Sequence, residues 1–164
     1  MIINVQDPTQ LITLQKSTRQ FSLVFTSGCF DLLHSGHIYL LNQMRVQTPA
    51  TAKLVVAIHS DAEITKHKGP QRPIFSAQHR ALLLDNIKAV DYVIIWEGWE
   101  NIVDLVFRLE PEFLATTADN LKRQNWANSW ESVAVKINAQ LIGIPRVNED
   151  LSTTSFINKI RNAK

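Results

Sequence analysis

The chain is poor in residues that would mark it as a specialised class of protein. Its 164 residues contain a single cysteine, Cys29. One cysteine excludes an intrachain disulfide and cannot by itself build a thiolate zinc site. No apolar run approaches the ~18 residues needed to cross a bilayer. The chain has no block of five or more Lys and Arg residues, the pattern that indicates a nucleic-acid partner, and its formal net charge is only +2.

The glycine-rich phosphate-binding motifs are also missing. The sequence has no Gly-x-Gly-x-x-Gly dinucleotide fingerprint and no loop ending in Gly-Lys-Ser or Gly-Lys-Thr. Any nucleotide site must therefore be built from other residues.

The bulk composition is that of an ordinary folded domain. Hydrophobic residues make up 45% of the chain and charged residues 20%, which argues against disorder and against a membrane protein. The length predicts a single domain over residues 1–164. The first residues lack the basic and apolar segments of a signal peptide, so we expect a cytoplasmic enzyme.

Strand-like and helix-like segments alternate along the chain. The strands are expected at residues 21–25, 53–59, 91–96, 112–116 and 140–144, and helices at 61–67, 76–87, 101–109, 129–139 and 152–161. A further helix is expected after the first strand, with His34 and His37 at its start and Ile38, Leu40, Leu41 and Met44 at helical spacing. Near-continuous apolar strands indicate burial on both faces. The pattern predicts an α/β fold with a doubly wound, Rossmann-like parallel sheet, whose ligands bind at the carboxyl ends of the strands.

The most informative segment is Thr-Ser-Gly-Cys-Phe-Asp-Leu-Leu-His-Ser-Gly-His, residues 26–37, between the first strand and its helix. A helix N-terminus presents unpaired N–H groups and about half a positive charge, which suits phosphate. Gly36 lets a phosphate approach the backbone. His34 and His37 lie three residues apart, so both can face the same anion. We expect this turn to bind a phosphoryl group. Cys29 within it is interpreted as a small residue at a crowded turn rather than a nucleophile.

Two further segments could meet phosphate. Lys66-His-Lys-Gly-Pro-Gln-Arg-Pro73 joins several cations to a glycine-containing loop, although such loops are usually solvated faces. Ser152, Thr153 and Thr154 place hydroxyls and free amides at the start of the last helix. By themselves these residues fit an ordinary N-cap equally well.

These segments together resemble the cytidylyltransferase-like nucleotidyltransferases. The histidine motif is similar to that family's hallmark, and the resemblance extends over about residues 21–161. The Lys-Gly-Pro-Gln-Arg-Pro loop looks most like the subgroup that adenylylates a heptose 1-phosphate in lipopolysaccharide assembly. Arg80 matches an arginine of the family that opens the helix after this loop, and Leu-Ser-Thr-Thr at residues 151–154 matches a sequence before the family's last helix.

The resemblance implies transfer of a nucleoside monophosphate from ATP or CTP to a phosphorylated small molecule, with release of pyrophosphate. His34, His37 and Lys68 would be catalytic, and Asp31 would be a carboxylate that either supports the residues in contact with substrate or associates with Mg²⁺. Mg²⁺ would arrive with the triphosphate, and we expect no metal site of the protein's own. The residues expected to bind nucleotide are Gly28, Cys29, Phe30, Asp31, Gly36, Lys66, Arg80, Asp119, Ser152, Thr153 and Thr154.

The sequence departs from the heptose enzymes after the fourth strand. Those enzymes carry a segment like Lys-Gly-Gly-Asp-Tyr, whereas this chain has Thr116-Thr-Ala-Asp-Asn120, in which only Asp119 matches. Two alternatives therefore stay open. One is a cytidylyltransferase acting on glycerol phosphate or a similar alcohol phosphate. The other is a nucleotide-binding member with reduced or lost turnover.

The remaining histidines and the tryptophans carry no recognisable pattern. His59, His67 and His79 are interpreted as structural or solvent-facing. The four tryptophans are assigned to the core or to subunit packing, with Trp99 a candidate for stacking on a ligand. We expect a homodimer, and no nucleic-acid or membrane partner.

Overall fold

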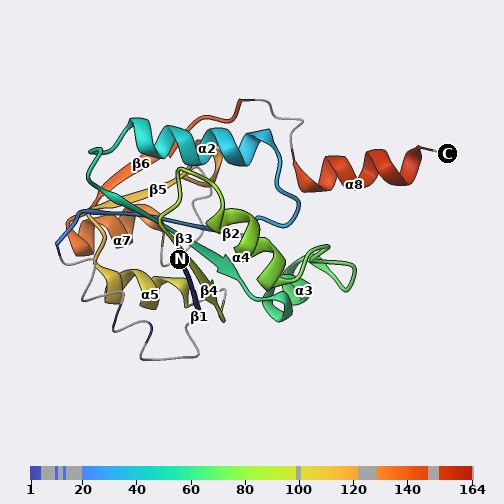
Figure 1. The fold of residues 1–164 in the computed structure, drawn as a ribbon, viewed down its shortest axis with the longest axis horizontal. Coiled ribbons are helices and arrows are strands. Elements are labelled where there is room, and N and C mark those ends of the chain that lie inside the picture. Colours follow the sequence, from blue (N-terminus) through green and yellow to red (C-terminus); the bar gives the residue numbers. More distant parts are fainter. Residues whose placement is uncertain are drawn as a thin grey trace.

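The computed structural model describes residues 1–4, 10, 13, 20–98, 101–121, 129–147 and 152–163. Its centre is a six-stranded sheet in the order β1-β4-β3-β2-β5-β6, in which every pair is parallel (Figure 1). The strands are β1 (Ile2–Asn4), β2 (Leu23–Gly28), β3 (Lys53–His59), β4 (Tyr92–Trp96), β5 (Phe113–Thr117) and β6 (Gln140–Ile144). The predicted α/β fold with a Rossmann-like parallel sheet is confirmed.

The order of the strands reverses at β2. The chain runs from β2 to β3 and β4 on one side, then crosses to β5 and β6 on the other, so β2 pairs with both β3 and β5. Crossing at this point leaves a crevice outside the carboxyl ends of the two neighbouring strands. The turn after β2, which carries the histidine motif, lies at this reversal.

Helices cover both faces of the sheet (Figure 1). The face with α2 and α4 buries Val24, Leu41 and Leu84, and the face with α5 and α7 buries Phe25 and Leu105. Successive residues of β2 thus enter opposite cores, which explains why its apolar run is continuous. The helices are α2 (Ser35–Val46), α3 (Asp61–Lys68), α4 (Ala77–Asp85), α5 (Ile102–Leu109), α6 (Ala118–Leu121), α7 (Trp130–Ile137) and α8 (Thr153–Asn162).

The observed limits of some elements differ from the predicted ones, because hydrogen bonding between strands outweighs the local sequence pattern. The first strand begins at Leu23 and continues through Thr26 to Gly28, because these residues pair with β3 up to Ile58. The three residues of β1 are too short for a periodic signal, so the sequence did not predict this edge strand. The single-turn helix α6 was missed for the same reason.

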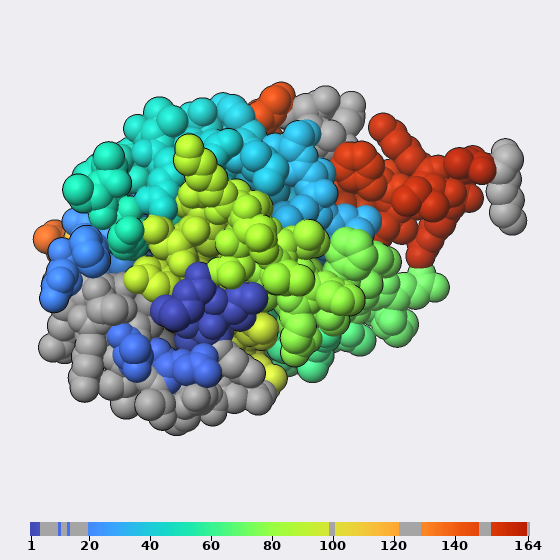
Figure 2. Space-filling view, in the orientation of Figure 1, coloured from blue at the N-terminus to red at the C-terminus, as the bar shows by residue number. Residues whose placement is uncertain are grey.

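α8 stands apart from the other helices. It projects from one side of the molecule, and none of its residues is fully buried (Figure 2). Phe156 near its start lies 5.6 Å from the His34 ring, between ring centroids, and Arg161 near its end hydrogen-bonds Gln71. None of the described helices is long and apolar enough to span a membrane.

A cluster of ion pairs links the sheet to α2 at the amino ends of the strands, opposite the turn that carries the histidine motif. The Asp91 carboxylate accepts the Leu54 amide N–H at 2.8 Å and pairs with Lys53 Nζ at 3.2 Å. It also pairs with the Arg45 guanidinium, whose Nε donates to the Ala89 carbonyl at 2.7 Å. This cluster holds α2 against the amino ends of β3 and β4.

We predict that Asp91→Ala lowers the free energy of unfolding by about 1–3 kcal/mol, because it leaves the Leu54 amide N–H without its acceptor and removes the carboxylate that pairs with Arg45 and Lys53. Urea unfolding followed by circular dichroism measures the change. Asp104→Asn on the exposed side of α5 is the matched control, expected within about 0.5 kcal/mol of the parent. Equal urea midpoints for Asp91→Ala and the control would contradict the role given to this cluster.

Candidate active site

His34 is the N-cap of α2. Its backbone is extended (φ −142°, ψ 170°), and its Nδ1 accepts the Gly36 amide N–H at 3.2 Å. Ser, Thr, Asp or Asn normally fill this position, and the imidazole replaces their oxygen. A nitrogen that accepts a hydrogen bond carries no proton, so the proton of neutral His34 lies on Nε2. This ring nitrogen is then a hydrogen-bond donor.

His37 lies one turn further along, stacked on His34. The two ring centroids are 3.9 Å apart, and the Phe30 ring packs against His37 at 5.0 Å. Burial, and secondarily the neighbouring His34, lower the pKa of His37 to about 4. Burial also lowers the pKa of His34, with the Arg146 charge as the second cause. His37 is therefore neutral at pH 7. Its Nδ1 is buried and has no hydrogen-bond partner in the described part of the chain.

The turn before α2 is shaped by close packing. Phe30 is buried with a left-handed backbone (φ 47°), and a Cβ at Gly28 would lie 3.0 Å from its ring. A side chain at position 28 would therefore press against the buried Phe30 ring. Burial raises the pKa of the Cys29 thiol despite three nearby cations, which works against a thiolate nucleophile.

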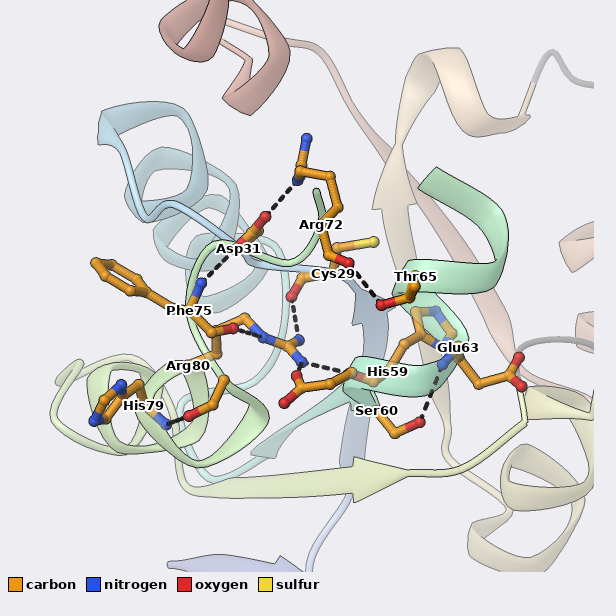
Figure 3. A network of polar contacts seen from close by, with 12 residues as sticks. Cys29, Asp31, His59, Ser60, Glu63, Thr65, Arg72, Phe75, His79 and Arg80 are labelled. Atoms are coloured by element: carbon orange, nitrogen blue, oxygen red, sulfur yellow. Dashed lines mark hydrogen bonds and ion pairs between the residues drawn. The ribbon is translucent and has the colours of Figure 1, made fainter. Parts of the chain in front are cut away.

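Asp31 holds the basic loop in place (Figure 3). Its buried carboxylate accepts from Arg72 Nε at 2.5 Å and from the backbone N–H groups of Ile74 and Phe75 at 2.8 and 3.0 Å. With three donors already on its oxygens, Asp31 fits the first of its two expected roles, support of the neighbouring residues, better than association with Mg²⁺. The described residues include no group of three or more His, Cys, Asp or Glu side chains placed to hold a metal ion.

Arg80 is fully buried beneath the turn (Figure 3). Its guanidinium donates to the carbonyl oxygens of Cys29 at 2.7 Å and of His59 at 2.8 Å, and pairs with Asp61 Oδ1 at 2.7 Å. Its Nε donates to the Phe75 carbonyl at 3.0 Å. We therefore interpret Arg80, expected from the sequence to bind nucleotide, as the residue that fixes the turn against β3.

Two cavities meet at the carboxyl ends of the central strands. The first, of about 290 Å³, is called the histidine cavity and is lined by Cys29, His34, Gly36, His37, Tyr39, Leu40, Lys68, Arg72, Thr117, Pro145, Arg146, Val147, Ser152, Thr153 and Thr154. The second, of about 240 Å³, is called the strand-end cavity and is lined by Ser27, Gly28, Cys29, His59, Lys68, Ile102, Thr116, Asn120, Ser129, Trp130 and Glu131. Cys29 and Lys68 belong to both.

The histidine cavity brings together the three segments singled out in the sequence. His34 and His37 come from the start of α2, Lys68 from the end of α3, and Thr153 from the start of α8. Ser152 caps α8 in a capping box with Ser155, with reciprocal hydrogen bonds of 3.1 and 3.2 Å. This cap fixes the hydroxyls and amides of the first turn at the cavity wall.

Other predicted site residues lie outside both cavities. Lys66 is exposed on α3, and Phe30 is part of the core. Asp119 pairs with Arg146 Nε at 2.8 Å, and only Arg146 of this pair lines the histidine cavity. Trp99, the stacking candidate, lies outside the described residues, as does Leu151.

Several cavity residues were not expected from the sequence. His59, interpreted from the sequence as structural or solvent-facing, is the last residue of β3 and lines the strand-end cavity. Burial is the main cause that lowers its pKa to about 4. Its place at the carboxyl end of an apolar strand was the available signal, because strand ends meet at the same edge of a parallel sheet. Trp130 and Glu131 gave no comparable signal, because the chain reaches the cavity there from the start of α7.

Comparison with known proteins gives one consistent result. A family model described as cytidylyltransferase-like matches residues 25–159. The bifunctional protein HldE of Helicobacter pylori (strain ATCC 700392 / 26695) is 32% identical, over 98% of this chain and 33% of that protein. HldE of Wolinella succinogenes is 38% identical, over 70% of this chain and 23% of that protein. The chain thus spans about a third of the length of the first of these relatives and less of the second.

Solved structures agree on the fold. The lipopolysaccharide core biosynthesis protein from Thermoplasma volcanium GSS1 superposes with a TM-score of 0.60 at 23% identity, covering 77% of this chain and 98% of that one. At this identity the likeness concerns the fold alone. The family model, in contrast, spans the turn after β2, the basic loop and the start of α8. The chain therefore belongs to the cytidylyltransferase-like nucleotidyltransferase family, as its histidine motif predicts.

Proposed function

We propose that the chain transfers a nucleoside monophosphate from ATP or CTP to a phosphorylated sugar. An oxygen of the acceptor phosphate attacks the α-phosphorus, the new O–P bond forms, and the bond to the β-phosphate oxygen breaks to release pyrophosphate. No covalent enzyme intermediate is needed. The protein positions the two substrates and stabilises charge that develops on the transferred phosphoryl group.

The histidine cavity supports the nucleotide half of this proposal. His34, with its proton on Nε2, and neutral His37 are hydrogen-bond donors for the α-phosphate oxygens. Lys68 and Arg72 line the same cavity and supply positive charge, and the amides and hydroxyls at the start of α8 suit the β- and γ-phosphates. Mg²⁺ enters bound to the triphosphate as part of the substrate.

The observation that carries the proposal is the unpaired Nδ1 of His37. Buried polar atoms nearly always have a partner, and an exception needs an explanation. This atom lies on a ring in the wall of a cavity lined by two histidines and three cations, which together suit a polyanionic ligand. A ligand that closes this cavity is a natural partner for the imidazole.

The strand-end cavity supports the acceptor half. It shares Cys29 and Lys68 with the histidine cavity, so a molecule bound there reaches the α-phosphate at the common wall. The heptose 1-phosphate reading rests on the Lys-Gly-Pro-Gln-Arg-Pro loop and on the HldE relatives. A glycerol-phosphate-type cytidylyltransferase is the alternative within the same reaction class.

The direct test is to incubate the chain with ATP or CTP, Mg²⁺ and a panel of acceptors, and to measure pyrophosphate. The panel contains a manno-heptose 1-phosphate, glucose 1-phosphate and glycerol 3-phosphate. We expect release that depends on both the nucleotide and the heptose phosphate. Release with glycerol phosphate alone would establish the alternative. Tight nucleotide binding without release from any pair would indicate a member that has lost turnover.

We predict that His34→Asn and His37→Asn each lower turnover by about 10²–10³, because the shorter Asn side chain cannot place a donor where the imidazole N–H meets the transition state. Asn keeps the helix cap at position 34, so the loss there is not a loss of folding. His79→Asn is the control, since His79 is exposed and lines neither cavity. Wild-type turnover in either cavity variant would remove that histidine from the mechanism.

A second prediction concerns the start of α8. Thr153→Leu replaces a hydroxyl in the wall of the histidine cavity and should raise KM for the nucleotide about tenfold or more, with little effect on KM for the acceptor. Asn158→Leu, on the exposed side of the same helix, should change neither constant. A larger effect on KM for the acceptor would show that the two substrates occupy the cavities in the opposite order.

A further inference from the structure

Four aromatic rings from three segments of the chain follow one another beside the histidine cavity. Between ring centroids, Phe30 of the turn after β2 lies 5.0 Å from His37, and His37 lies 3.9 Å from His34. Phe156 of α8 lies 5.6 Å from His34. At these distances the rings are in contact, and we call the four residues the aromatic row. The row connects the two proposed donors to each other and to α8.

The Phe30 end of the aromatic row is anchored in the core. Phe30 is 4% exposed and belongs to the core cluster on the α2 face of the sheet. Its left-handed backbone (φ 47°) is a conformation that bulky residues seldom adopt, and it persists only where the surrounding structure holds it. His37 therefore packs against a ring whose position is fixed.

The Phe156 end of the row belongs to the wall of the histidine cavity. The Phe156 amide N–H donates to the carbonyl oxygen of Ser152, the N-cap of α8, at 3.1 Å. Ser152 and Thr153 line the cavity, and the start of α8 lies beside that of α2 (Figure 1). The Phe156 ring and the groups proposed to bind the triphosphate tail thus stand on one hydrogen-bonded turn of helix.

His34 lies between these two ends, and its own cap bond does not fix its ring plane. The Gly36 amide N–H holds one ring atom, Nδ1, at 3.2 Å. Rotation of a histidine ring about χ2 is only weakly restricted, so one such bond leaves the plane free to tilt. The contacts with His37 and Phe156 oppose this tilt. Misplacement of a catalytic group by about 1 Å can lower a rate by about 10²-fold, so the tilt matters for a donor.

We propose, on the basis of the proposed function, that Phe156 is a positioning residue that holds the His34 imidazole in the orientation required by the transition state. Phe156 is not among the residues that line the histidine cavity, so it acts through His34. Because Phe156 and Thr153 share the start of α8, the site of the triphosphate tail and the donor to the α-phosphate keep a fixed spacing. An aliphatic side chain fills a similar volume but lacks the flat face that pairs with an imidazole.

The first test measures kcat and the nucleotide KM for pyrophosphate release. Phe156→Leu should lower kcat about tenfold and change the nucleotide KM less than about threefold, because the donor tilts while the cavity wall stays intact. Phe156→Tyr keeps the ring and should restore most of the lost rate. Ile160→Leu is the matched control with wild-type kcat expected, since Ile160 is 71% exposed one turn further along α8.

The same substitution in a His34→Asn background distinguishes a positioning role from a structural one. If Phe156 acts through His34, Phe156→Leu should change kcat less than about twofold once the imidazole is absent. A loss of about tenfold in both backgrounds would overturn the inference, because Phe156 would then act independently of His34. Wild-type kcat in Phe156→Leu alone would overturn it as well.

Nitrogen-15 NMR of the imidazoles tests the contact without turnover. The chemical shifts of the ring nitrogens report which of them carries the proton, and His34→Asn assigns the His34 signals. At about pH 8, where histidine is neutral, we expect wild-type His34 to hold its proton on Nε2, as the Gly36 bond requires. Phe156→Leu should shift His34 toward a mixture of both tautomers, and an unchanged tautomer would contradict the proposed role.

Together the two measurements separate this inference from the proposed function. A tautomer mixture in Phe156→Leu, with no pyrophosphate release from any substrate pair, would reject the proposed function and keep the positioning of His34. Pyrophosphate release with unchanged kcat and an unchanged tautomer in Phe156→Leu would reject the role of Phe156 alone.

Discussion

The arrangement of both cavities depends on the Arg80 guanidinium. It donates to the carbonyl oxygens of Cys29 and His59, which lie at the carboxyl ends of the adjacent parallel strands β2 and β3. Such carbonyls have no further strand partner, and leaving them buried and unpaired would be costly. One side chain therefore satisfies both and fixes the turn after β2 against β3. Cys29 lines both cavities and His59 lines one, so this link sets the distance between their walls.

A second buried charge complements the first. Arg80 is buried and pairs with the partly exposed Asp61, while the buried Asp31 pairs with the partly exposed Arg72. Each buried charge thus has an opposite partner nearer to water, which avoids the large penalty of an isolated ion in the interior. Asp31 also accepts two backbone N–H groups of the segment after Arg72. The turn and the basic loop are therefore held in one piece beside the site.

The strands and helices of the fold were predicted well, because they follow from the periodicity of hydrophobic residues along the chain. The strand at Lys53–His59 and that at Gln140–Ile144 were predicted with their observed limits, since turn residues flank both apolar runs. The meeting of His34, Lys68 and Thr153 could be expected only through resemblance, because no local pattern brings together residues so far apart. The burial of Arg80 could not be predicted, because an arginine at the start of a helix is normally exposed. The place of His59 was only partly predictable, because the end of a parallel strand puts it at the site edge of the sheet but does not tell which cavity it lines.

The common wall of Cys29 and Lys68 has a consequence for the order of events in catalysis. Two ligands that share one ammonium group cannot bind independently, because the first to arrive attracts the lysine and changes the field met by the second. For the proposed transfer, occupancy of the two cavities is then coupled. Because the proposed attack on the α-phosphorus is direct, it requires a ternary complex, which corresponds to sequential kinetics with intersecting double-reciprocal plots and no exchange of label between nucleotide and pyrophosphate when the acceptor is absent.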